Sequence, residues 1–88
     1  VMAPVHNAAR DNDVEALRQL LDAGPQRVND DRGGEGRAPL HYACQAGSLE
    51  AVQLLLDRGA DINTPRLSGF TPLMEACYYG RAEVVALM

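Results

Sequence analysis

His41 and Cys44 stand three positions apart in PLHYACQAG, a spacing that places both side chains on one face of a helix. With His6 as a third ligand they would suit zinc, and a cysteine paired with a histidine can also act as a nucleophile. Zinc needs three or four convergent ligands, however, and a later copy of this motif carries Met74 in place of His41. We therefore expect no metal site, no catalytic residue and no cofactor, and we predict that these residues are not an enzyme.

The segment DDRGGEG, residues 30–36, is the other stretch whose side chains could bind an ion. Asp30, Asp31 and Glu35 offer carboxylate oxygens, but they lack the spaced ligands of a calcium loop. No lysine follows the glycines, so the segment does not match a phosphate-binding loop either. We expect a long, flexible connection that carries surface charge.

Composition narrows the class of protein further. The 88 residues suit one domain, and 47% of them are hydrophobic, as in globular chains. The net charge of −4 offers no basic surface, so we expect no nucleic acid partner. No apolar run approaches the ~20 residues that cross a bilayer, so we expect no membrane insertion. Two cysteines make no disulfide framework, which favours an intracellular location, in the cytoplasm or the nucleus.

An internal repeat organises the elements that hold these residues. A shift of 33 positions places Pro39, Leu40, Ala43, Cys44, Gly47, Glu50, Val52 and Leu54 on Pro72, Leu73, Ala76, Cys77, Gly80, Glu83, Val85 and Leu87. A shift of 35 places an earlier copy on the middle one, through Pro4, His6, Ala8, Glu15, Ala16, Leu20, Leu21 and Gly24. Periods of this length are typical of stacked repeat proteins.

Each copy is predicted to form two short helices. Thr71 can cap the first helix of the third copy. The second copy has Ala38 at this position, and without a capping side chain its first helix should be less stable by about 1 kcal/mol. The first helices should end at Asn12, Gly47 and Gly80, because asparagine and glycine tolerate a left-handed turn best.

The second helices should begin after Asp13 or Ser48 as caps and close at Gly24 and Gly59. Their apolar stripes are Val14, Leu17, Leu20 and Leu21 in the first copy and Leu49, Val52, Leu55 and Leu56 in the second. In the first helices, the paired small positions that include Cys44 and Cys77 should face the interior, so neither a disulfide nor a reactive thiol is expected.

These residues resemble the ankyrin repeat family. Its pattern of glycine, TPLH, paired small residues, glycine, EVV-LLL and GADVN is similar to GRAPLHYACQAGSLEAVQLLLDRGADIN and GFTPLMEACYYGRAEVVALM. The resemblance implies an all-α solenoid of stacked helix-turn-helix units joined by β-hairpin-like loops. It also implies that His41 is structural, with ring nitrogens bonded to backbone between repeats.

The resemblance divides the single domain, residues 1–88, into repeat 1 at about 1–35, repeat 2 at 36–68 and a truncated repeat 3 at 69–88. Gln19 replaces the leucine of the later copies, as on the polar outer face of a terminal repeat. The third copy has no such polar substitution and stops inside its second helix. We therefore expect further repeats, or another chain, to cover the C-terminal end.

In ankyrin repeats, partners usually bind the concave face made by the loop tips and the exposed side of each first helix. Carried over to this sequence, the resemblance predicts a partner-binding set of Arg10, Asp11, Arg37, Tyr42, Gln45, Phe70, Glu75, Tyr78 and Tyr79. The set contains all four aromatic residues of the chain, and tyrosine and arginine commonly dominate interface energetics. We expect Tyr42 to point to the open face.

Two functions remain open at this point. The first is a protein-interaction module, an adaptor or scaffold that holds a protein or peptide partner. The alternative is a regulatory or targeting segment of a larger multidomain protein, such as a ubiquitin-ligase subunit, a kinase or an ion channel.

Overall fold

The computed structural model describes residues 4–88. In them six α-helices form three pairs: α1 (Pro4–Arg10) with α2 (Val14–Ala23), α3 (Pro39–Ala46) with α4 (Leu49–Asp57), and α5 (Pro72–Tyr78) with α6 (Ala82–Leu87). Two short 3-10 helices, η1 (Pro25–Asn29) and η2 (Gly34–Gly36), lie between the first two pairs. This part of the chain contains no strand, so the prediction of an all-α fold is confirmed. The first three residues of the predicted repeat 1 lie outside the described part.

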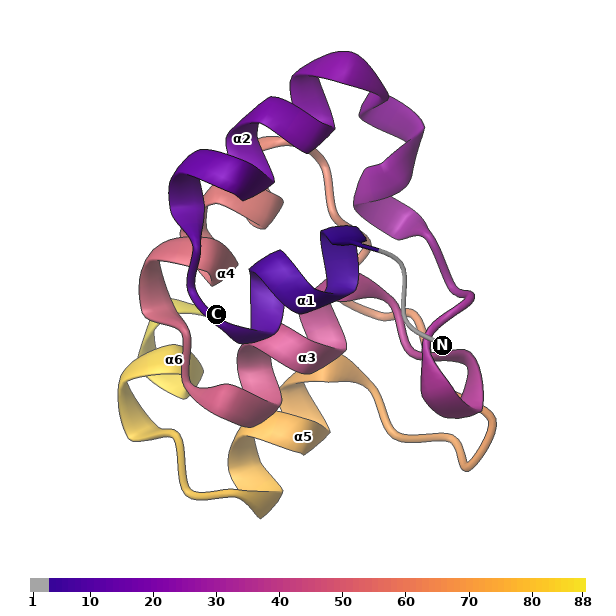
Figure 1. The fold of residues 1–88 in the computed structure, drawn as a ribbon. Helices are drawn as coiled ribbons and strands as arrows, with labels where there is room; N and C mark the ends of the chain where they lie inside the picture. Colours follow the sequence, from indigo (N-terminus) through magenta and orange to yellow (C-terminus); the bar gives the residue numbers. More distant parts are fainter. Residues whose placement is uncertain (1–3) are drawn as a thin grey trace.

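The helices form two layers (Figure 1). In one layer α3 packs between α1 and α5, and α2, α4 and α6 form the other layer. The apolar stripes predicted for the second helices lie between the layers, where Leu17, Leu21, Val52 and Leu55 are buried. Burial of these leucine and valine side chains is the main force that holds the stack together.

Two of the predicted helix caps are confirmed. Asp13 Oδ1 accepts a hydrogen bond from the Ala16 N–H at 3.2 Å, and Thr71 Oγ1 accepts one from the Met74 N–H at 3.3 Å. Each bond satisfies one of the backbone donors that the first turn of a helix leaves free.

Ser48 holds the predicted N-cap position of α4, but its side chain makes no cap hydrogen bond. The Ser48 hydroxyl donates instead to the Arg10 carbonyl of the preceding helix pair, at 2.7 Å. The first turn of α4 is capped from that pair too, because Asn12 Oδ1 accepts from the Ala51 N–H at 3.0 Å. Asn12 has the predicted left-handed backbone, with φ 57°. Neighbouring helix pairs therefore satisfy each other's backbone groups.

Two tight turns project from the same side of the stack, at residues 33–37 (tip 1) and 66–70 (tip 2). In each, the first N–H donates to the last carbonyl, at 3.1 Å in tip 1 and 2.9 Å in tip 2. The Leu67 N–H of tip 2 donates to the Glu35 carbonyl of tip 1 at 2.7 Å, which joins the tips directly. The loops are thus hairpin-like turns without strands, and backbone hydrogen bonds hold tip 1 closed and join it to tip 2.

The third helix pair has one uncovered face within residues 4–88. Leu40 of α3 is 1% exposed beneath α5, whereas its counterpart Leu73 is 38% exposed. The same difference separates Cys44, which is buried, from Cys77, which is exposed. The prediction that Cys77 faces the interior is wrong, because no helix of the described chain packs on that side of α5.

Candidate partner-binding surface

The inner face consists of the exposed sides of α1, α3 and α5 together with the two tips. Its main feature is an aromatic cluster of Phe70, Tyr78 and Tyr79. The Phe70 and Tyr78 rings meet edge to face with centroids 5.9 Å apart, and the Tyr78 and Tyr79 rings do so at 5.0 Å. Tyr78 is 71% exposed and Tyr79 42%. The sequence placed these three residues on one surface, and the structure brings them into contact.

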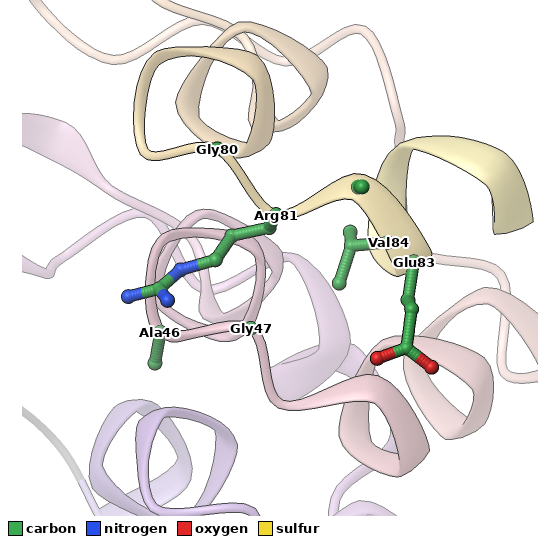
Figure 2. Close-up of a pocket in the computed structure, with 7 residues that line it drawn as sticks. Ala46, Gly47, Gly80, Arg81, Glu83 and Val84 are labelled. Carbon is green, nitrogen blue, oxygen red and sulfur yellow. The ribbon is translucent and has the colours of Figure 1, made fainter.

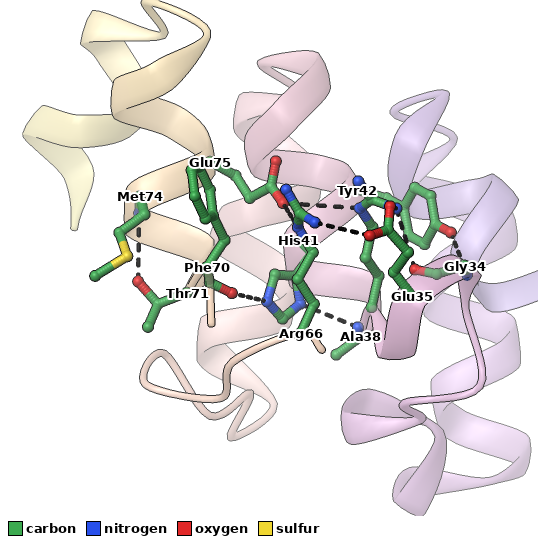
Figure 3. A network of polar contacts seen from close by, with 11 residues as sticks. Gly34, Glu35, Ala38, His41, Tyr42, Arg66, Phe70, Thr71, Met74 and Glu75 are labelled. Carbon is green, nitrogen blue, oxygen red and sulfur yellow. Dashed lines mark hydrogen bonds and ion pairs between the residues drawn. The ribbon is translucent and has the colours of Figure 1, made fainter. Parts of the chain in front are cut away.

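Arg66 in tip 2 contacts this cluster through the ring of Phe70. Its guanidinium carbon lies 4.8 Å from the centre of the Phe70 ring, within the range of a cation–π contact. Arg66 Nε also donates a hydrogen bond to Glu75 Oε1, and Arg66 Nη1 donates one to Glu35 Oε1 at 3.3 Å (Figure 3). Phe70 therefore contacts both Arg66 and Tyr78.

Arg37 in tip 1 extends the same network. It lies 3.5 Å from Glu35 and 3.7 Å from Glu75, and its guanidinium carbon is 5.8 Å from the centre of the Tyr42 ring. Two arginines and two glutamates therefore connect the tips to α3 and α5. Because both arginine side chains are at most 15% exposed, these ion pairs are screened less by salt than surface pairs are.

Two of the predicted binding residues do not reach the surface. Glu75 is 0% exposed because it turns inward to meet Arg66 and Arg37. Tyr42 is 8% exposed, and its hydroxyl accepts a hydrogen bond from the Gly34 N–H at 2.7 Å. The expectation that Tyr42 points to the open face is wrong, since tip 1 folds over the ring. Both residues support the surface from below.

A close fit explains how tip 1 covers Tyr42. A side chain at Gly33 would place its Cβ 2.5 Å from the Arg37 carbonyl oxygen and 2.7 Å from the Tyr42 ring. Only glycine fits there, so the RGGEGR segment is shaped to close over the tyrosine. The sequence shows these glycines but not the ring that they meet.

His41 is structural, as the resemblance implied. Its Nδ1 accepts from the Ala38 N–H at 3.0 Å, and its Nε2 bonds the Phe70 carbonyl at 3.0 Å. This pattern requires a neutral ring protonated at Nε2, and burial accordingly lowers the pKa of His41. Burial also raises the pKa of the Cys44 thiol to about 12, so the thiol stays protonated at neutral pH. Within residues 4–88 no group of three or more His, Cys, Asp or Glu could hold a metal ion.

The remaining predicted residues line the C-terminal ends of the inner helices. Arg10 and Asp11 form a two-bond ion pair on α1, at 2.9 and 3.2 Å, and the bond from Arg10 lowers the pKa of the Asp11 carboxyl. Gln45 on α3 is half-buried. Like Tyr78 and Tyr79, these residues lie at the C-terminal ends of the inner helices, but they do not belong to the aromatic cluster.

Two arginines that the sequence did not single out contribute to this side of the molecule. Arg66 connects Phe70 to Glu75, as described above. Arg81, after α5, donates from Nε to the Gln45 carbonyl at 2.9 Å. No local pattern marks either residue, because their partners lie nine and 36 positions away in the sequence.

The comparisons with known proteins agree with this architecture. A family model described as ankyrin repeats, in three copies, matches residues 5–88. A search of the curated proteins gave no match. No helix of residues 4–88 has the length and hydrophobicity needed to cross a membrane. Since the match spans nearly the whole sequence, and the stacked helix pairs follow the repeat, the chain belongs to the ankyrin repeat family.

Proposed function

We propose that this chain is a protein-interaction module whose inner face binds a protein or peptide partner. Ankyrin repeats generally mediate contacts between proteins. The observation that carries the proposal is the aromatic cluster, in which Tyr78 presents 71% of its surface to solvent. Clustered aromatic rings bury a large area on binding at a small cost in side-chain entropy, which makes them frequent hot spots.

The support behind the cluster favours this role. Arg66 fixes the Phe70 ring, and Glu75 fixes Arg66, so part of the surface is ordered before a partner arrives. A preorganised surface loses less conformational freedom on binding than a mobile one does. In this arrangement Phe70, Tyr78 and Tyr79 make the central contacts, and Arg10, Asp11 and Gln45 lie at the periphery.

Affinity capture followed by a titration tests the proposal. The wild-type chain and a Tyr78→Ala, Tyr79→Ala variant are immobilised, captured proteins are identified, and the dissociation constant of each is measured by calorimetry. We expect the double substitution to weaken binding by about 100-fold, because two hot-spot rings that each contribute about 1.4 kcal/mol account for a tenfold loss apiece. The variant should melt at nearly the wild-type temperature, since both rings are exposed.

Gln19→Ala provides the matched control, because Gln19 is exposed on α2, in the other layer of helices. This variant should bind every partner as the wild type does. If the tyrosine variant also kept wild-type affinity for all captured proteins, the inner face would not be the binding surface.

We also propose that a further helical repeat covers the outer side of α5 and α6, whether it belongs to the same polypeptide or to another chain. Three apolar side chains on that side are at least a third exposed: Leu73 at 38%, Met74 at 50% and Leu87 at 37%. Their counterparts Leu40 and His41 in α3 are at most 1% exposed beneath the next repeat. A covering repeat would remove this apolar area from water.

A further inference from the structure

The inner helices end in three chemically different pairs of residues. α1 is followed by the Arg10–Asp11 ion pair, α3 ends near Gln45 and Ala46, and α5 ends at Tyr78 and Tyr79. Along the ends of α1, α3 and α5 the side chains therefore change from an ion pair, through the polar Gln45, to two aromatic rings. A partner that lies along these helix ends meets different chemistry at each repeat.

Arg81 adds a positive charge at the middle one of these helix ends. The bond from its Nε to the Gln45 carbonyl holds the guanidinium at the C-terminal end of α3. Gly47 allows this approach, because a Cβ there would lie 3.0 Å from Arg81 Cδ. An arginine has five N–H donors, so four of them are left for a ligand.

No carboxylate of residues 4–88 neutralises Arg81, although six of the eight arginines form ion pairs. Arg81 and Glu83 both line a pocket of about 300 Å³ between the ends of α3 and α5, but the Glu83 carboxylate points away from the Arg81 guanidinium (Figure 2). The acidic residues of the inner face, Asp11, Glu35 and Glu75, are each paired with an arginine. An approaching carboxylate thus meets one free positive charge and no free negative charge on this face.

The net charge of −4 does not override this local arrangement. Of the carboxylates that form no ion pair in residues 4–88, Glu50, Asp57 and Glu83 lie on α4 and α6, and the others lie on loops. At physiological ionic strength the Debye length is about 8 Å, so charges farther away than that are largely screened. At the end of α3 the guanidinium is the charged group in direct contact with the helix, and Glu83 of the same pocket points away from it.

We propose that the inner face binds an extended acidic segment of a partner protein, with an apolar side chain on the aromatic cluster and a carboxylate on Arg81. This inference rests on the proposed function of the inner face. α5 packs on α3, and the axes of packed helices lie about 8–10 Å apart, which is the spacing that this binding mode assumes between the rings on α5 and the guanidinium at the end of α3. An extended chain advances about 3.3 Å per residue, so the apolar residue and the acid should lie about three positions apart.

Selection from a displayed library of random dodecapeptides tests this directly. The library is panned against the wild-type chain, Arg81→Gln and Tyr78→Ala, and the enriched sequences are compared. The wild type should enrich peptides with an apolar residue about three positions from Asp or Glu. Arg81→Gln should keep the apolar preference and lose the acidic one, with the best wild-type peptide bound about tenfold more weakly, the loss of one charge-assisted hydrogen bond.

Raised salt gives a second readout, because it should weaken this peptide on the wild type and affect Arg81→Gln much less. If wild type and Arg81→Gln enriched acids equally, or if the wild type enriched Lys and Arg, the acidic partner would be ruled out. If Tyr78→Ala enriched the same peptides as the wild type, the proposed function of the inner face would fail as well. Failure of the wild type to enrich any peptide would overturn the inference of an extended acidic segment, while the affinity capture described above would still test the proposed function.

Discussion

At the scale of single residues, the site depends on side chains that no partner can touch. Tyr42 and Glu75 occupy the same position in successive copies of the repeat, and both are buried. Each is covered by an arginine from a tip, Arg37 over the tyrosine and Arg66 against the glutamate. A position that appeared to belong to the surface therefore supports it from below.

Glu75→Gln tests the support at this position. The substitution keeps the shape of the side chain but removes the negative charge that two largely buried arginines face. We expect the free energy of unfolding to fall by about 2 kcal/mol, because breaking a buried ion pair leaves charges without compensation. Urea unfolding followed by circular dichroism measures this difference.

Glu15→Gln is the matched control for this prediction. Glu15 pairs with Arg18 at 3.3 Å, but its side chain is 73% exposed. Removing an exposed ion pair should change the free energy of unfolding by less than about 0.5 kcal/mol. Equal effects of the two substitutions would show that the Glu75 network contributes no more than a surface pair.

At the scale of elements, the helices of one repeat are completed by residues of another. Ser48 donates to the Arg10 carbonyl at 2.7 Å, and Arg81 donates to the Gln45 carbonyl at 2.9 Å. The two donors hold equivalent positions in successive repeats, so one inter-repeat bond occurs twice with different side chains. The stability of each helix pair is therefore coupled to that of its neighbour.

Asn12 allows this coupling to be separated from backbone strain. Asn12→Gly keeps a residue that tolerates φ 57° but loses the bond to the Ala51 N–H, which should cost about 1 kcal/mol as a lost helix cap. Asn12→Ala loses the bond and also strains the left-handed turn, so it should cost about 1 kcal/mol more. Urea unfolding of both variants checks the order. If glycine were as stable as wild-type asparagine, the cap would contribute nothing.

At the scale of the whole molecule, the two ends of the stack differ. Gln19, on the first pair of helices, is exposed, as expected for a polar terminal face. At the other end Leu73, Met74 and Leu87 are exposed. The same residue type at the same place in the motif therefore contributes differently in repeats 2 and 3.

Leu40→Ala and Leu73→Ala measure that difference. Leu40 is 1% exposed, so its truncation leaves a cavity and should cost about 3 kcal/mol of unfolding free energy. Leu73 is 38% exposed, and its truncation should cost less than about 1 kcal/mol. Denaturant unfolding of the two variants provides the comparison. Equal losses would mean that the face of α5 is already covered in solution, for example by a second copy.

The sequence by itself determined the period, the helix pairs and most of their local signals. The caps at Asp13 and Thr71 and the turn at Asn12 follow from the sequence pattern, and the structural role of His41 follows from the resemblance to ankyrin repeats. Most of these features depend on residues within three or four positions of one another, where the backbone can adopt few other conformations. The sequence also puts Phe70, Tyr78 and Tyr79 on one surface, whereas the contacts between their rings are seen only in the structure.

Only the tertiary structure decided which of the candidate residues reach the surface. Tyr42 and Glu75 are buried, Cys77 is exposed, and Asn12 caps a helix 39 positions farther along the chain. These outcomes depend on what packs against each side chain, and the packing partners come from other repeats. A repeat motif specifies one unit almost completely, whereas burial is a property of the stack.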